Sequence, residues 1–396
     1  MIGAAIADHH FDETSRFEEC ICLHREFSEQ VAEAGARFVV SAGDVYERAS
    51  TPIERRAVAE WLQDLGRRVR GPIVIVRGNH DRTLDLDILR RLWMPVGSQV
   101  IVVEGLGIQR LSIGLWSPSV ESDDEESAAL DVGCLAWPRK ATLLAALEKP
   151  VTPAESSEVA QDLLRQSLTG MRGLWRDGVP RLLVSHAMVS GAVVSTGQPL
   201  VGQDMELSIS DLALAGAELT ILGHIHKSQE WTFGEDGHDR SYLYTGSPRR
   251  TAYGELENKG WVLLKHDGAA WSWERRWLSA PPMLLWEATW RDGDFWFEVP
   301  RTLGYRGADI RFRYAVAAEE RDAARLAATK LRDYTLSNGA ARFTIDPVVT
   351  ATSTARVPDV ARATTLEEKL RAMWKARGES VEERLLAKVA VLEEES

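Results

Sequence analysis

The sequence predicts a layered α/β fold over most of the chain, followed by a small α+β unit and two short C-terminal helices. Five short apolar runs, each bounded by glycine or polar residues, are typical of parallel strands with helices on both faces. They span residues 2–7, 38–42, 73–76, 182–184 and 219–222. The pattern changes after Pro281-Pro282, and the last thirty or so residues carry two amphipathic stripes. These observations divide the chain at 1–279, 280–350, 351–364 and 365–396.

Each of the five runs is followed by side chains that bind metal ions. In order they are Asp8 and His10, Asp44, Asn79 with His80 and Asp81, His186, and finally His224 and His226. Ligands of open α/β sheets bind beyond the carboxyl ends of the strands, so we expect these residues to share one edge. A lone Asp or His at a strand end is usually a turn or a cap. Five such segments in this order indicate a site.

The residue types favour a two-metal centre for phosphoryl transfer. Two divalent ions about 3.5–4 Å apart can stabilise both the attacking and the leaving oxygen of an in-line displacement. Imidazole together with carboxylate suits manganese, iron or zinc, and argues against an all-oxygen calcium or magnesium site. Asp44 stands alone at its strand end and is the natural bridging carboxylate.

These segments resemble the calcineurin-like metallophosphoesterase superfamily, whose signature is D-x-H, GD, GNHD, H and GHxH. Within it, the chain is similar to the SbcD-type DNA double-strand-break repair nucleases. The segment 244–250, followed by Tyr253-Gly254-Glu255 and Lys259-Gly260, matches that family after the last metal histidines. The resemblance implies a nuclease domain over 1–279, a DNA-capping domain over 280–350, and a helix-loop-helix over 365–396 that binds an ATPase.

The resemblance also implies roles by position. One ion would be held by Asp8, His10, Asp44 and His226, and the other by Asp44, Asn79, His186 and His224. The cofactor would be two Mn²⁺ ions, with Mg²⁺, Fe²⁺ or Zn²⁺ as alternatives. His80 would stabilise or protonate the leaving oxygen, and Asp81 would be the residue that orients it.

Three further residues are expected to face the substrate. Many relatives carry a second active-site histidine three residues after the bridging aspartate, where this chain has Glu47. That carboxylate would lie along the path of the DNA backbone and shift the balance between exonuclease and endonuclease work. Arg249 and Arg250 follow closely after the metal histidines and would contact the phosphates. The formal net charge of −12 with a pI near 5.4 predicts weak intrinsic DNA affinity, with a partner supplying the rest.

Composition favours an intracellular enzyme. The 396 residues are enough for a large core with appendages. Three cysteines give no disulfide framework, and the N-terminal apolar run has no basic leader. No segment approaches the roughly 20 apolar residues of a membrane helix. We expect a cytoplasmic, nucleoid-associated protein.

A helix is predicted to begin at Pro52, because Thr51 and Glu54 form a capping box around a proline at the first helical position. In the resembled family this helix and the next, which carries Ile88, Leu89, Leu92 and Trp93, contribute to a homodimer interface. Core packing is the alternative, and the sequence does not separate the two.

The C-terminal region is predicted to be a linker followed by two partner-binding helices. Capping boxes at Thr365 with Glu368 and at Ser380 with Glu383 start the helices. Short amphipathic helices after a flexible linker cannot easily bury their stripes alone. The family analogy supplies an SbcC-type, SMC-like ATPase as the partner. The expected contact residues are Leu366, Leu370, Met373, Trp374, Leu385, Val389 and Leu392.

The function expected from these features is Mn-dependent cleavage of DNA, as a double-strand exonuclease and single-strand endonuclease of an SbcCD-type repair complex. A stand-alone phosphatase or cyclic-nucleotide phosphodiesterase is the alternative enzyme, and it would not need the capping unit or the terminal helices. A non-enzymatic scaffold ranks last, because every ligand position is filled.

Overall fold

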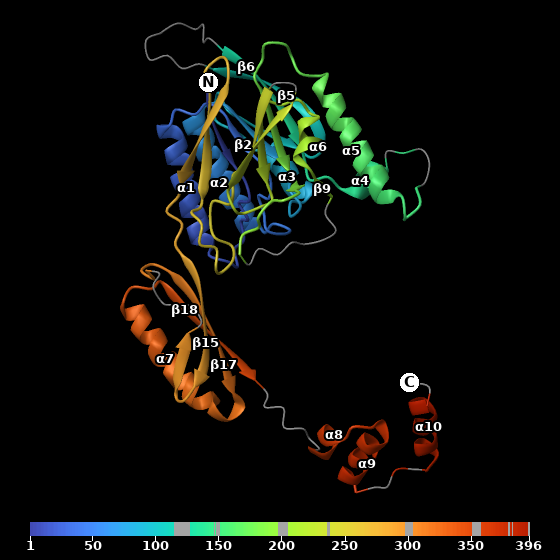
Figure 1. Ribbon diagram of the computed structural model, residues 1–396. Helices are drawn as coiled ribbons and strands as arrows, with labels where there is room; N and C mark the ends of the chain where they lie inside the picture. The colour runs from blue at the N-terminus through green and yellow to red at the C-terminus, as the bar shows by residue number, and fades with distance from the viewer. Residues whose placement is uncertain are drawn as a thin grey trace. The chain divides into compact units, whose positions relative to one another are not determined.

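The computed structural model describes residues 1–114, 127–145, 147, 151–196, 205–235, 238–297, 304–350, 358–378, 381 and 383–394. The chain divides into two compact units (Figure 1). The first unit comprises residues 1–284 with 307–309, and the second comprises 285–306 with 310–396. The acidic stretch at 121–126 lies outside the described residues.

The first unit is built from two six-stranded sheets. The first sheet has the order β14-β13-β1-β2-β3-β4, and the second has β11-β12-β10-β7-β6-β5. Their strands are β1 (Ile2–Ile6), β2 (Val39–Ser41), β3 (Pro72–Val76), β4 (Gln99–Val103), β5 (Leu106–Gly114), β6 (Ser127–Leu135), β7 (Arg181–His186), β10 (Leu219–Gly223), β11 (Gln229–Glu235), β12 (His238–Tyr244), β13 (Gly260–His266) and β14 (Trp271–Trp277). A separate short pair joins β8 (Met188–Val189) to β9 (Glu206–Leu207).

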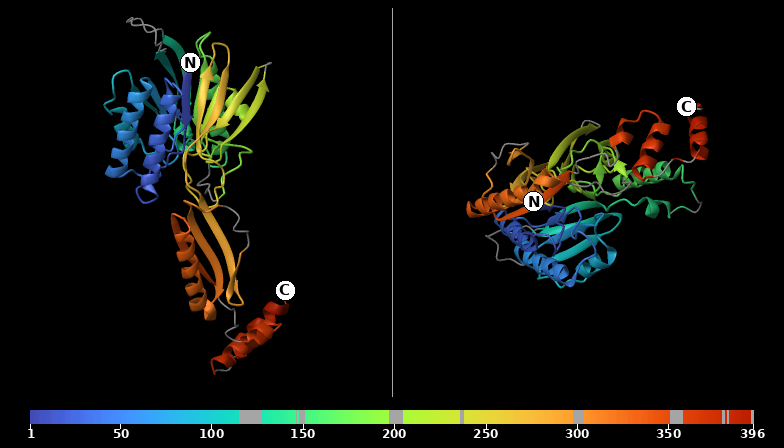
Figure 2. Two further views of the ribbon diagram at one scale, coloured as in Figure 1. Left: turned by 90° about the vertical axis from the view of Figure 1, so that its left-hand side faces the viewer. Right: turned by 90° about the horizontal axis from the view of Figure 1, so that it is seen from below.

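The two sheets pack face to face, and the helices cover their outer faces (Figure 2). Residues such as Val40 and Val74 of the first sheet meet Val184 and Ile221 of the second in one buried cluster. The helices of this unit are α1 (Phe17–Glu33), α2 (Pro52–Val69), α3 (Thr83–Arg90), α4 (Lys140–Leu144), α5 (Ser156–Arg172) and α6 (Ile209–Ala213). The result is a four-layer α/β/β/α sandwich, which confirms the predicted layered fold class.

The helices on the first sheet follow from local sequence signals. In α2, the Thr51 hydroxyl accepts a hydrogen bond from the Glu54 amide at 3.3 Å, and the Glu54 carboxylate accepts one from the Thr51 amide at 2.8 Å. This confirms the predicted capping box. Leu62 and Leu65 of α2 then pack with Phe27 of α1 in the cluster behind the first sheet. These contacts hold the helices against the strands that carry the site residues.

The second unit contains an α+β layer and three C-terminal helices. Its four-stranded sheet has the order β16-β15-β17-β18 and carries one long helix. The elements are β15 (Met283–Arg291), β16 (Asp294–Phe297), β17 (Asp309–Ala317), the 3₁₀ turn η1 (Ala318–Glu320), α7 (Arg321–Ser337) and β18 (Arg342–Thr350). Buried Phe312 and Tyr314 of β17 and Ala324 and Ala328 of α7 supply its apolar core.

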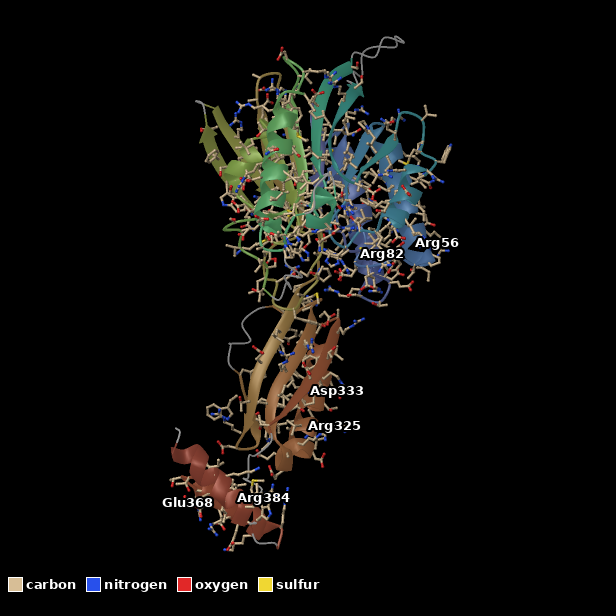
Figure 3. The ribbon with its side chains drawn as sticks, turned by 90° about the vertical axis from the view of Figure 1, so that its right-hand side faces the viewer. Arg56, Arg82, Arg325, Asp333, Glu368 and Arg384 are labelled. Atoms are coloured by element: carbon tan, nitrogen blue, oxygen red, sulfur yellow. The ribbon has the colours of Figure 1, made fainter. Side chains whose placement is uncertain are left out.

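The C-terminal helices are α8 (Pro358–Arg362), α9 (Leu366–Ala376) and α10 (Glu383–Glu394). The segment 358–362 was expected to belong to the linker and is instead helical. Glu368, labelled in Figure 3, accepts hydrogen bonds from the amides of Thr364 and Thr365, as the predicted cap of α9 requires. Ser380, the predicted cap of the second helix, lies outside the described residues.

Candidate metal centre

Five strand ends deliver the predicted site residues to one edge of the sandwich. In the first sheet β1, β2 and β3 run parallel and in register, with Ile6 opposite Ser41 and Ser41 opposite Ile75. In the second sheet β7 and β10 are parallel, and His186 pairs with Gly223. The carboxyl ends of both sets of strands therefore open at the same edge. This places the predicted ligands at one common edge, as the strand-end pattern requires.

Backbone contacts hold the loops of the first sheet together. The Asp8 amide donates to the Gly43 carbonyl, and the His10 amide donates to the Asp44 carbonyl, both at 3.0 Å. Gly78 lies directly against Asp44. A Cβ atom at this glycine would stand 2.0 Å from the Asp44 Oδ1 atom, so only glycine allows the two loops to approach so closely.

Several site residues adopt a left-handed backbone conformation. Asp8, His10, Asp44 and His224 have φ angles of 55°, 47°, 53° and 102°. Non-glycine residues rarely adopt such angles, and each costs on the order of 1–3 kcal/mol. Backbone strain of this kind concentrates at functional sites, where the surrounding structure enforces it.

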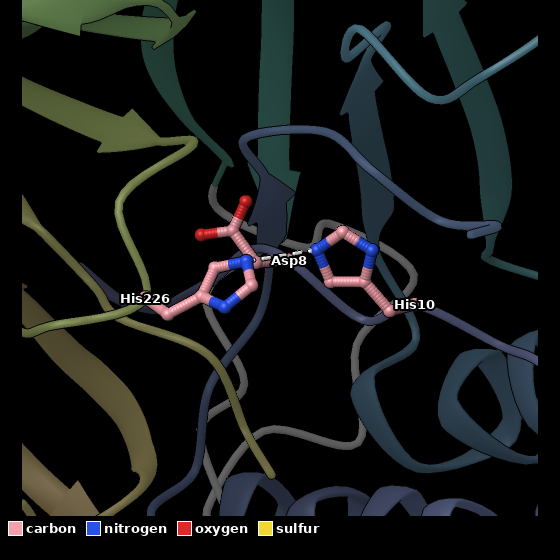
Figure 4. A group of neighbouring side chains, drawn as sticks. All are labelled: Asp8, His10 and His226. Atoms are coloured by element: carbon pink, nitrogen blue, oxygen red, sulfur yellow. Dashed lines mark hydrogen bonds between the residues drawn. The ribbon is translucent and has the colours of Figure 1, made fainter. Parts of the chain in front are cut away.

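The first group of ligand atoms comes from Asp8, His10 and His226 (Figure 4). The two histidines face each other through their Nε2 atoms, which are 3.0 Å apart. The His10 Nδ1 atom lies 2.7 Å from the Glu47 carboxylate, and the His226 Nδ1 atom lies 2.9 Å from the Thr251 hydroxyl. When each Nδ1 carries the proton, both Nε2 lone pairs point at one another. Within the described part of the chain, the buried Asp8 Oδ2 atom has no hydrogen-bond partner.

The second group brings together Asp44, Asn79, His186 and His224. The His186 Nδ1 atom donates to the Ala42 carbonyl at 2.6 Å, so its Nε2 atom presents a lone pair once the ring is neutral. This Nε2 atom faces the Asn79 Oδ1 atom at 2.9 Å and the Asp44 Oδ2 atom at 3.2 Å. The His224 Nδ1 atom lies 3.2 Å from the same Asn79 oxygen. Several acceptor atoms converge on one small volume.

The pKa shifts of the buried carboxylates and histidines reflect this crowding. Burial raises the pKa of Asp8 to about 6. Burial acts in the same direction on Asp44, but His186 and His10 outweigh it and hold the Asp44 pKa well below its usual value. Burial disfavours the charged form of His186, yet Asp44 and Asp8 together raise its pKa to about 9. In the ion-free protein a proton on His186 thus neutralises part of the carboxylate charge.

The donor set fits divalent ions of the manganese, iron or zinc class. Imidazole nitrogens and carboxylate oxygens that face one another without an intervening hydrogen are stable only around a cation or a bound proton. The lone pairs of His10 and His226 and the partnerless Asp8 oxygen meet this description. Asp44 lies between the two groups, 3.2 Å from His186 and 3.9 Å from His10. Asp44 is thus the carboxylate that would serve as a ligand to both ions if two were bound.

His80 differs from the predicted ligand residues in exposure and orientation. Its side chain is 27% exposed, whereas those of His10 and His186 are 3% and 0% exposed. Its Nδ1 atom is oriented by the Glu47 main-chain carbonyl at 2.6 Å. Burial lowers its pKa, but Asp44 and the Glu47 carbonyl more than offset this and raise the His80 pKa above the usual value.

Asp81 occupies a different place from the one expected. Its carboxylate accepts hydrogen bonds from the amides of Val45, Tyr46 and Gly78 at 2.9–3.1 Å. It therefore ties the loop after β2 to the loop after β3. The expected orienting role toward the His80 ring is taken by the Glu47 carbonyl instead.

Of the three expected substrate residues, Glu47 is partly exposed beside the site, whereas the two arginines are buried. The Glu47 carboxylate points at His10 and lies 3.8 Å from the His80 Nδ1 atom. Arg249 is buried and donates to the carbonyls of Ser15 and His10, both at 2.8 Å. Arg250 is buried and donates to the carbonyls of Glu255, Ala280, Pro281 and Glu257. The two arginines hold the loops around the site and are not placed to contact phosphates.

Four residues around the histidines were not anticipated. Thr251 and Glu255 stand behind His226, and buried Lys259 pairs with Glu255 at 2.7 Å. Trp137, at the end of β6, packs its ring 4.8 Å from that of His224 and shields the second group from water. Glu255 and Lys259 belong to the segment that resembles the nuclease family, but nothing in their spacing reveals the contact with His226.

Comparison with known proteins identifies the family. A model of the calcineurin-like phosphoesterases matches residues 4–228, which is more than half of the chain. The chain belongs to this family. The matched span begins in β1 and ends just after His226, and therefore contains all five strand-end segments.

Individual relatives are more distant. The SbcD subunit of the nuclease SbcCD from Bacillus subtilis (strain 168) is 25% identical over 295 residues, which cover 71% of this chain and 71% of that protein. Among solved structures, the Plasmodium protein GAP50, described as the anchor in the inner membrane complex, is 12% identical, with a TM-score of 0.44 over 70% of this chain and 84% of that chain. A dimetal phosphatase from Danio rerio is 12% identical, with a TM-score of 0.38 over 70% and 96% of the two chains.

Metal binding by this phosphoesterase is expected to release protons. His186, with a pKa of about 9, carries a proton at pH 7.5, whereas Asp8, with a pKa of about 6, is mostly ionised. A metal ion must displace the His186 proton, so Mn²⁺ affinity should rise about tenfold per pH unit between pH 6 and 9. Below pH 6 the dependence should steepen, because Asp8 is then protonated as well. Calorimetry of Mn²⁺ binding in buffers of different protonation enthalpy measures the protons released; release of none at pH 7.5 would contradict the expectation.

Proposed function

We propose that this protein is a metal-dependent DNA nuclease, the counterpart of the SbcD subunit in an SbcCD-type repair complex. Membership of the calcineurin-like phosphoesterases makes it a phosphoester hydrolase that uses divalent metal ions. The observation that carries the narrower proposal is the similarity to the Bacillus subtilis SbcD subunit, because it extends over 295 residues, beyond the 225-residue span of the family match.

We further propose Mn²⁺ as the metal ion and the cytoplasmic nucleoid as the location. Among the described helices, none is both long enough and apolar enough to traverse a bilayer.

The proposed ligands are Asp8, His10, Asp44 and His226 for one ion, and Asp44, Asn79, His186 and His224 for the other. When bound, such ions neutralise charge on the phosphate and lower the pKa of an attacking water. Glu47 and Thr251 orient the two histidines of the first group, and the Ala42 carbonyl orients His186. Trp137 limits the access of water to the second group.

His80 is the proposed general acid. Its ring is held through Nδ1 by the Glu47 carbonyl, which leaves Nε2 to donate a proton. Because the pKa of His80 is raised, the ring keeps this proton up to a higher pH than an ordinary histidine does. Its partial exposure lets it reach the leaving sugar oxygen, where proton donation contributes typically about 10²–10⁴-fold in rate.

A nuclease assay of the purified full chain tests the proposal. Linear duplex DNA, single-stranded DNA and bis-4-nitrophenyl phosphate are incubated with Mn²⁺, with and without a co-encoded SbcC-like ATPase. We expect degradation of duplex ends that the ATPase stimulates, and nicking of single strands. Hydrolysis of the small diester alone, with no cleavage of either DNA under any condition, would favour a stand-alone phosphodiesterase or phosphatase.

The C-terminal helices support a partner. On α9, Leu366 and Met373 are 45% and 39% exposed, and Trp374 is half-buried with the Arg377 guanidinium 5.6 Å from its ring. On α10, Leu385 is exposed, but Val389 is buried and is therefore unsuited to the contact expected of it. The side chain of Leu392 lies outside the described residues. We propose that the α9 stripe docks on the ATPase by helix-in-groove recognition.

Trp374→Glu is expected to weaken co-purification with the ATPase severely. The tryptophan is the largest apolar side chain of the α9 stripe, and loss of such an anchor typically costs at least about 2 kcal/mol. Ala376→Glu is the matched control, because it places the same carboxylate on the opposite side of the helix. Metal content and hydrolysis of bis-4-nitrophenyl phosphate should be unchanged in both variants. Full-strength binding of the Trp374→Glu variant would show that the stripe does not serve the partner.

A homodimer is the second proposed assembly. The structure divides the apolar residues of α2, α3 and the segment that follows α3 into two sets. Leu62 and Leu89 are buried in the core of the first unit, whereas Ile53, Ile88 and Trp93 are 49%, 45% and 73% exposed. We propose that the exposed set contributes to the dimer interface that the family resemblance implies.

A further inference from the structure

The two groups of ligands differ in what stands behind their histidines. In the first group, the His10 Nδ1 atom faces the Glu47 carboxylate at 2.7 Å. The His226 Nδ1 atom faces the Thr251 hydroxyl at 2.9 Å and the Glu255 carboxylate at 3.7 Å. In the second group, the His186 Nδ1 atom donates to the neutral Ala42 carbonyl at 2.6 Å, and the nearest carboxylate to it, at 3.9 Å, is that of Asp8. A carboxylate that is not itself a proposed ligand thus stands behind each histidine of the first group, whereas the only carboxylate near the His186 Nδ1 atom among the described residues is the proposed ligand Asp8.

Glu255 is fixed as an anion by its surroundings. Its side chain is completely buried, and the buried Lys259 ammonium lies 2.7 Å from it. Lys259 also contacts Glu257 at 2.8 Å, so two carboxylates share one ammonium. The trio keeps a net charge of −1. The Thr251 hydroxyl donates a hydrogen bond to Glu255 at 3.2 Å and lies 2.9 Å from the His226 Nδ1 atom. It therefore connects the anionic Glu255 to His226.

The two groups therefore differ in the carboxylates that serve them. The first has Asp8 as a ligand, shares Asp44, and has Glu47 and Glu255 in its outer shell. The second shares Asp44 but otherwise has the neutral amide of Asn79. Outer carboxylates make an imidazole more basic and fix its ring, and their loss typically weakens metal affinity by about 10–100-fold.

We propose that Glu47 and Glu255 are positioning residues for His10 and His226, and that they make the Asp8–His10–His226 position bind its divalent ion more tightly than the Asn79–His186–His224 position. This inference rests on the proposed two-metal centre. It gives Glu47 the role of positioning the proposed metal ligand His10, in place of the role along the DNA backbone that the sequence suggested. It also predicts that the two ions are loaded in sequence.

Titration of the full-length, metal-stripped protein with Mn²⁺, followed by calorimetry and by electron paramagnetic resonance of free Mn²⁺, tests this order. The wild-type protein should bind in two resolved steps. Asn79→Ala should remove only the weaker step and thereby assign it. Glu47→Gln should weaken the tighter step by about 10–100-fold and leave the weaker step within about twofold. Glu255→Gln should act in the same direction.

Glu274→Gln is the matched control, because it removes one carboxylate that pairs with Arg276 on the edge strand β14. It should leave both steps unchanged. Glu47 is partly exposed, so Glu47→Gln carries little risk to folding and decides the outcome even if Glu255→Gln fails to fold. The inference would be overturned if Glu47→Gln left the tighter step unaltered, or if the two wild-type steps had equal affinity. Either result would leave the proposed function standing. A wild-type protein that binds no Mn²⁺ would overturn the proposed function as well.

Discussion

Replacement of Asp44 by alanine is expected to remove both metal ions and all phosphoesterase activity. The Asp44 Oδ2 atom lies 3.2 Å from His186 and 3.9 Å from His10, so one carboxylate serves both ligand groups. Its Oδ1 atom accepts the His80 amide at 2.9 Å, so the loop that carries His80 depends on it too. No other proposed ligand touches residues of both groups and the catalytic loop.

The measurement is metal content after gel filtration, together with the thermal shift that Mn²⁺ produces. A ligand present at 100 times its dissociation constant stabilises the folded state by about 2.7 kcal/mol. Mn²⁺ should raise the unfolding temperature of the wild-type protein, and it should leave that of Asp44→Ala unchanged. Asp44→Asn keeps the shape and the contact with the His80 amide while removing the charge, so it separates metal loss from loop collapse. Retention of two ions by Asp44→Ala would refute the bridging role.

The architecture and the position of the site follow from local patterns in the sequence. The runs that end at Asp8, Asp44 and Asn79 are short and apolar, and those before Asp44 and Asn79 contain several β-branched residues, as is typical of buried strands. Parallel strands must present their carboxyl ends at a common edge, so the convergence of their polar neighbours is dictated by topology. The capping boxes at Thr51 and Thr365 are equally local, and both form as predicted.

The orientation of individual side chains does not follow from these patterns. Arg249 and Arg250 resemble a phosphate-binding pair, but the irregular loops around the site leave carbonyl groups without strand partners. Buried carbonyls must find donors, and the two guanidinium groups supply them. Glu47 faces His10 because an isolated bridge pairs Phe11 with Tyr46 and brings the two loops together. Neither this bridge nor the unpaired carbonyls are visible in the spacing of residues.

His80→Ala is expected to abolish DNA cleavage while leaving both ions bound. The alternative role for His80 is that of a metal ligand, because its ring shares a group of convergent ligand atoms with His10 and Asp44. Its greater exposure and the position of its Nδ1 atom against the Glu47 carbonyl favour the catalytic role. Loss of a general acid typically reduces the rate by about 10²–10⁴-fold.

Two measurements on the same His80→Ala protein separate these roles. Elemental analysis should find the wild-type number of Mn²⁺ equivalents, whereas loss of one equivalent would make His80 a ligand. The second measurement compares substrates that differ in their leaving group. The 4-nitrophenolate of bis-4-nitrophenyl phosphate departs without protonation, but the sugar oxygen of DNA needs a proton, so the defect should be far smaller on the small diester. Equal defects on both substrates would show that His80 stabilises the phosphoryl oxygens, because charge on those oxygens develops with either leaving group.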